Sequence, residues 1–86
     1  MKTFSLEIRT PEKSLFNGRV TKFTARAVDG EIGVLADHVP LATALAAGRI
    51  SCLAESGEKD GVDCQRGFLF FDNGAATILV SSLPLA

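Results

Sequence analysis

The 86-residue sequence has no tryptophan and no tyrosine, and it has only one histidine, two cysteines and three prolines. Two cysteines do not make a disulfide framework, and with a single histidine their spacing fits no usual zinc motif. Nine basic residues are balanced by ten acidic ones without a basic run. These shortages argue against a disulfide-stabilised protein, a metal or cofactor site and a nucleic-acid-binding face.

Long hydrophobic runs are also missing. No apolar stretch approaches the ~18 residues that a membrane-spanning helix needs, and "MKTFSLEIRT" is not followed by a signal-peptide core. We therefore expect a single domain over residues 1–86 that stays in the cytoplasm or an equivalent compartment. Hydrophobic residues still make up 47% of the chain, and this excess predicts a surface covered by a partner protein.

Apolar and polar residues alternate with a period of two along most of the chain, as in half-buried β-strands. The alternation predicts strands over residues 3–9, 19–28, 32–35, 49–55, 62–64, 68–71 and 76–80, with a turn at Asn17-Gly18. The stretch "ADHVPLATALAAG" breaks the alternation and predicts a loop with about one helical turn, and the tail "SSLPLA" has no clear element. Short strands with turns about every 8–12 residues indicate an all-β sandwich or barrel.

The apolar run "FLFF" at residues 68–71 presents hydrophobic side chains on both faces of its strand. Phe68 and Phe70 point one way, and Leu69 and Phe71 point the other way. Because only one face of a strand meets the core of a two-layer domain, one pair is outward. The outward pair is either covered by loops of the chain itself or forms a docking surface for another protein.

The single histidine, His38, lies among the carboxylates Asp29, Glu31 and Asp37. Adjacent residues of an extended segment point to opposite sides, so Asp37 is poorly placed to orient the ring of His38. No serine or cysteine in a nucleophile elbow accompanies them, and "GEIG" lacks the helix N-terminus and lysine of a phosphate loop. We therefore expect no catalytic residue and no enzyme activity.

The two cysteines flank the polar turn "SGEKDG". A hairpin centred near Glu58 would place Cys52 opposite Cys64 on the core face. Opposed residues lie near each other without requiring a bond, and a reducing cytoplasm disfavours one. We expect two free, buried thiols.

Three stretches together resemble the epsilon subunit of bacterial and chloroplast F-type ATP synthases. "GEIGVLADHVPLATALAAGRI" resembles the family's Gly-Glu-aliphatic-Gly, His-x-Pro-Leu and following Gly, at residues 30–33, 38, 40–41 and 48. "LFNGRV" resembles its Phe-x-Gly-x-Val, and "CQRGFLFFDNGAATILV" resembles its Ser-Gly-Gly-Phe stretch and final strand. One departure is Gln65-Arg66, where the family usually has Ser-Gly, so that a charged side chain stands in a tight place. This departure puts the local packing, or the gamma contact there, in question.

The resemblance implies a flattened two-layer β-sandwich of short, mostly antiparallel strands in the central stalk. This domain would dock on the gamma subunit and the c-ring, and it would couple ion-driven rotation to ATP synthesis without catalysis. Glu31 would face the c-ring, and His38 would lie near gamma. We expect both side chains to be exposed on loops. We assign Leu69 and Phe71 to the gamma-facing surface as well, with Phe68 and Phe70 as the alternative pair.

The family continues into a helical hairpin that can inhibit hydrolysis and bind ATP, and the sequence ends at Ala86 before such a segment. The resemblance therefore implies no bound nucleotide for these residues. It also implies a peripheral location on the cytoplasmic face of a bacterial membrane or the stromal face of the thylakoid. The alternative function is a free-standing β-sandwich module that binds a protein or a small ligand.

Overall fold

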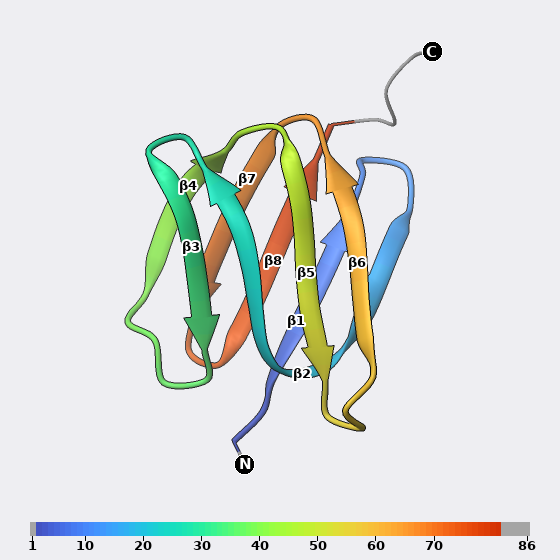
Figure 1. Ribbon diagram of the computed structural model, residues 1–86, viewed down its shortest axis with the longest axis vertical. Coiled ribbons are helices and arrows are strands. Elements are labelled where there is room, and N and C mark those ends of the chain that lie inside the picture. The colour runs from blue at the N-terminus through green and yellow to red at the C-terminus, as the bar shows by residue number, and fades with distance from the viewer. Residues whose placement is uncertain (1, 82–86) are drawn as a thin grey trace.

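A computed structural model describes residues 2–81 of the chain, and within them it has eight strands and no helix. The strands are β1 (Phe4–Arg9), β2 (Ser14–Ala27), β3 (Gly30–Leu35), β4 (Leu41–Leu45), β5 (Gly48–Ala54), β6 (Lys59–Cys64), β7 (Gly67–Asp72) and β8 (Ala75–Val80). The all-β prediction is confirmed (Figure 1).

The strands form two layers that face each other (Figure 1). The front layer contains β3, the second half of β2, β5 and β6, and the back layer contains β4, β7, β8 and β1. Every pairing is antiparallel except that of β1 with β8. The fold is thus the flattened two-layer sandwich of mostly antiparallel strands that the resemblance implied.

Strand β2 belongs to both layers. Its first part pairs with β1 as far as Val20, and its second part pairs with β3 and β5. The pairing with β5 shifts register between Val20 and Lys22, where the strand passes from one layer to the other. At its far end Ala27 pairs with Leu45 of β4, so β2 joins the two layers at both of its ends.

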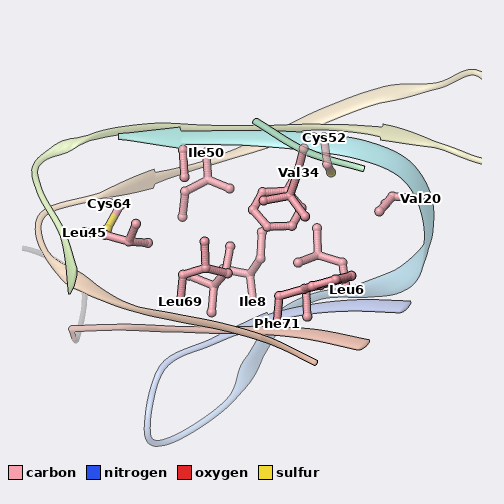
Figure 2. Packing of buried hydrophobic residues seen from close by; sticks show 14 of the residues in the cluster. Leu6, Ile8, Val20, Val34, Leu45, Ile50, Cys52, Cys64, Leu69 and Phe71 are labelled. Atoms are coloured by element: carbon pink, nitrogen blue, oxygen red, sulfur yellow. The ribbon is translucent and has the colours of Figure 1, made fainter. Parts of the chain in front are cut away.

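The core lies between the layers and is built from alternate residues of the strands (Figure 2). The ring of Phe4 packs edge-on against Phe71, with ring centroids 5.4 Å apart, and lies 5.9 Å from the ring of Phe23. The buried hydrophobic residues are Phe4, Leu6, Ile8, Val20, Phe23, Ala25, Ala27, Val34, Leu45, Ile50, Cys52, Cys64, Leu69, Phe71, Ala76, Ile78 and Val80. The alternation read from the first and last strands therefore identified their core faces correctly.

The predicted turn at Asn17-Gly18 is wrong, because both residues lie inside β2. The chain instead reverses over residues 10–13, where the hydroxyl oxygen of Thr10 accepts the N–H groups of Glu12 and Lys13 at 3.2 and 3.1 Å. The N–H of Thr10 also donates to the carbonyl of Lys13 at 2.9 Å. A side-chain turn of this kind needs no glycine, and Thr10 is buried as part of it.

The predicted loop with a helical turn at residues 36–48 is also wrong in part, since Leu41–Leu45 forms β4. This strand pairs with β7 along its whole length, and only Leu45 is fully buried. Three small residues among five hide the alternation, so tertiary pairing decides the conformation. The tail was assigned no element, and residues 82–86 of it lie outside the described residues.

The hairpin of β5 and β6 is centred on Ser56 rather than Glu58, so Cys52 pairs with Asp60 and Cys64 pairs with Gly48. Gly57, with φ of 94°, donates its N–H to the carbonyl of Ala54 at 2.9 Å, which closes the turn earlier than predicted. The residue opposite Cys52 is therefore residue 60 rather than residue 64. Because this register shift is an even number of residues, both cysteine side chains stay on the core face. Both thiols are buried and free, as predicted. They lie at opposite ends of the hairpin (Figure 2). Cys64 pairs with Gly48, which is four residues from Cys52 in β5, so the two positions are about 13 Å apart along the strands.

Candidate functional site

The run at residues 68–71 is divided sharply between the core and the surface. Leu69 and Phe71 are buried and point into the core (Figure 2), whereas Phe68 and Phe70 are 52% and 49% exposed. The assignment of Leu69 and Phe71 to a docking surface is therefore wrong, because a partner cannot reach side chains that fill the space between the layers. The alternative pair, Phe68 and Phe70, is the outward one.

Phe68 and Phe70 stack on each other with ring centroids 6.1 Å apart and an interplanar angle of 20°. Phe68 lies between Ala44 of β4 and Leu79 of β8, and Phe70 pairs with Ala42 of β4. We call these five residues the aromatic patch. Leu79 is itself 40% exposed, so the outer face of the back layer carries three large apolar side chains side by side.

One end of the aromatic patch is hollowed. A groove of about 410 Å³ is lined by Pro11, Val28, Phe68 and Leu79 among others, and Val28 is 66% exposed. Contiguous apolar surface of this kind marks sites that another protein covers, and aromatic residues are enriched in the cores of such interfaces. Leu79 was not identified from the sequence as a surface residue of interest. It occupies an outward position of the last strand, which a polar residue would normally fill.

Glu31 lies in β3, not in a loop, and its side chain is exposed. It is the second residue of the strand, next to the turn that joins β2 to β3, and it pairs across the ladder with Arg26. Among residues 2–81, no ion pair within 4.0 Å involves this carboxylate. The carboxylate of Glu31 is thus exposed at this end of the sandwich.

His38 follows the opposite end of β3 and is half-buried, whereas an exposed position was expected. Its Nδ1 lies 2.6 Å from the carbonyl oxygen of Val39, and its ring packs edge-on against Phe71, with centroids 6.1 Å apart. Within the described residues it forms no ion pair with Asp37 or any other carboxylate. His38 is therefore partly a packing residue, and Glu31 and His38 lie at opposite ends of β3, so they form no common site.

The outer face of the front layer is polar. A shallow cavity of about 540 Å³ there is lined by Lys22, Arg49 and Lys59 among others, and Arg49 forms an ion pair of 2.8 Å with Asp63.

Within residues 2–81, no cluster of three or more potential metal ligands occurs, and no helix is long and apolar enough to cross a membrane.

The question raised by Gln65-Arg66 has a simple answer, because both side chains are exposed in the connection between β6 and β7. Their backbone is held by the N–H of Ser81, which donates to the carbonyl of Arg66 at 2.9 Å. The charged side chain therefore does not enter the core.

Residues 3–85 match the family described as ATP synthase, Delta/Epsilon chain, beta-sandwich domain. The chain belongs to this family. Its relatives include the ATP synthase epsilon chain of Natranaerobius thermophilus, 35% identical over 86 aligned residues, which are 99% of this chain and 61% of the relative. The ATP synthase epsilon chain of Lactiplantibacillus plantarum is 32% identical over 83 residues, 94% of this chain and 58% of the relative.

Two solved structures contain chains with the same fold. A chain of the Euglena gracilis mitochondrial ATP synthase, in a structure of OSCP, F1 and c-ring, has a TM-score of 0.84 at 28% identity, over 91% of this chain and 50% of its own length. A chain of the Tetrahymena thermophila mitochondrial ATP synthase central stalk and c-ring has a TM-score of 0.76 at 17% identity, over 94% and 65%, and supports the fold alone. The chain thus spans about half to two thirds of the length of these relatives.

Proposed function

We propose that this chain is the β-sandwich domain of an epsilon-type subunit of the central stalk of an F-type ATP synthase. It has no catalytic role of its own, and it docks on the gamma subunit and on the c-ring, so that ion-driven rotation of the ring is coupled to ATP synthesis. The domain acts at a membrane-associated complex without entering the membrane, on the cytoplasmic face in a bacterium or the stromal face in a chloroplast.

The observation that carries the proposal is the aromatic patch. The stacked pair Phe68 and Phe70, together with Leu79, forms an apolar surface that no other part of residues 2–81 covers. We assign this surface to gamma, and we keep His38, whose ring contacts the core residue Phe71, as a second gamma-facing residue. We assign Glu31, at the other end of β3, to the polar loops of the c-ring.

Co-purification tests the proposal. The tagged chain, expressed with the gamma subunit of the same organism, is expected to retain gamma through affinity and size-exclusion steps. The double variant Phe68→Ser/Phe70→Ser is expected to fold and to lose gamma. The control Lys59→Ser shortens an exposed side chain on the opposite layer and is expected to retain it. Failure of the unchanged chain to retain gamma would overturn the proposal and favour the free-standing binding module.

A further inference from the structure

Strand β3 has an unpaired edge whose main-chain groups can be identified one by one. The carbonyl of Arg26 accepts the N–H of Ala46 at 2.8 Å, so the even-numbered residues in this half of β2 direct their main-chain groups away from β3. The ladder with β3 therefore uses the odd-numbered residues of β2, whose partners in β3 are residues 30, 32 and 34. The N–H and C=O groups of residues 31, 33 and 35 point to the other side.

On that other side, no strand pairs with β3 among the described residues, and β3 forms the left margin of the front layer in Figure 1. Among the main-chain groups that point to this side, the structure of residues 2–81 engages only the carbonyl of Leu35, which accepts the N–H of His38 at 3.0 Å. Three N–H groups and two carbonyls of Glu31, Gly33 and Leu35 are thus spaced as one side of a further ladder. An unpaired edge of this kind is a template for an added strand.

The opposite margin of the front layer, β6, is protected against such pairing. The N–H of Gly61 donates to the side chain of Asp60 at 2.8 Å, which removes a donor from the edge. Lys59, Asp60 and Asp63 place three charges in the six residues of β6. Charged residues on an edge strand disfavour the addition of another chain. Strand β3 has a single charged residue, Glu31, and no such protection.

Gly33 gives a second indication of close approach. Its φ is not positive, and a Cβ built on it would find its nearest atom, in the side chain of Thr24, at an ordinary contact distance of 3.9 Å. Neither the backbone nor the packing of this chain requires a glycine there. A glycine inside a strand often marks a site where another backbone approaches closely.

We propose that an extended segment of the subunit on which the domain docks adds to β3 as an antiparallel strand, hydrogen-bonded to Glu31, Gly33 and Leu35. This inference rests on the proposed docking on gamma and names the backbone contact within it. The pairing uses the main chain of Glu31 and leaves its carboxylate on the outer face. The side chain of Leu35 is 55% exposed, and together with Ala36 and Leu53 it lines a groove of about 350 Å³. The added segment is therefore expected to carry an apolar residue beside Leu35.

A second copy of the chain is the less suitable occupant. Two β3 strands related by a two-fold axis would place Gly33 opposite Gly33 and Glu31 opposite Leu35. Such a ladder has no favourable cross-strand side-chain pair.

Amide hydrogen exchange, measured by NMR on the labelled chain alone and in complex with gamma, tests the inference. In the complex, exchange at residues 31, 33 and 35 is expected to slow by about tenfold or more. Ile32 and Val34 already donate to β2 and are expected to change little, and the edge amides of Lys59 and Asp63 are expected to stay fast.

The outcomes separate the two proposals. If the complex forms while the amides of residues 31, 33 and 35 still exchange fast, strand addition is overturned and docking on gamma is left intact. Absence of any complex would overturn both. Protection that rises with concentration in the chain alone, with a dimer in sedimentation, would assign the edge to a second copy and refute the assignment to gamma.

A pair of proline variants adds a second measurement. Gly33→Pro removes an N–H that has no partner among residues 2–81, and proline is tolerated at such positions of an edge strand. We expect a preserved melting temperature and binding to gamma weakened by about fivefold or more. Lys59→Pro removes an equally free N–H from β6 and is expected to leave binding unchanged. Equal binding by both variants would contradict the inference.

Discussion

Replacing Phe70 by threonine tests how much of the aromatic patch is available to a partner. Phe70 is 49% exposed, so roughly 100 Å² of its ring remains to be covered. At about 25 cal/mol per Å², that area is worth about 2.5 kcal/mol as an upper limit, or close to two orders of magnitude in Kd. Threonine keeps the strand preference of the position while removing the ring.

The assay is calorimetric titration of the chain with gamma, together with thermal unfolding of the chain alone. Phe70→Thr is expected to weaken binding by tenfold or more with a small change in Tm. The adjacent Leu69→Ala is the matched control, since Leu69 is completely buried and its truncation costs about 2–5 kcal/mol of folding stability. Its Tm is expected to fall by about 8 °C or more. Unchanged binding by Phe70→Thr, or a loss of Tm as large as that of Leu69→Ala, would refute the reasoning.

Three further predictions concern single sites. Glu31→Gln is expected to change stability by less than about 0.5 kcal/mol, whereas His38→Ala loses its ring contact with the core and costs about 1 kcal/mol; chemical denaturation distinguishes the two. Gly67→Ala is expected to lower Tm sharply, because its Cβ would collide with the carbonyl oxygen of Leu79, and a stable variant would contradict this geometry. Burial raises the pKa of both cysteine thiols, so the folded chain keeps them protonated where the unfolded chain ionises them. Stability is therefore expected to fall as pH rises above about 8.5, and less so when both cysteines are alanine; identical pH profiles would refute the assignment.

The sequence predicts those parts of the fold in which large apolar residues alternate with polar ones. Phe4, Leu6 and Ile8 identify the core face of β1, and Ala76, Ile78 and Val80 identify that of β8, because a strand repeats every two residues. Strand β4 escaped prediction because alanine and threonine give a weak alternation. Its conformation is decided by pairing with β7, a contact between segments more than twenty residues apart.

The candidate site was predictable only as a choice between two pairs. Residues 68–71 are apolar on both faces, so the pattern identifies a strand without identifying its outward side. The answer depends on whether Leu69 or Phe68 meets the ring of Phe4 and its neighbours, which is a property of the assembled core. The hairpin register failed for a related reason, since Gly57 rather than the centre of the polar stretch sets the turn.

The bent strand β2 also has a mechanical consequence. Its 14 residues pair with β1 in one layer and with β3 and β5 in the other. Sliding one layer past the other would therefore shear two ladders at once while covalent backbone resists the displacement. A load applied to the aromatic patch reaches the opposite face through continuous chain, so the domain would deform under torque as one stiff block rather than as two plates.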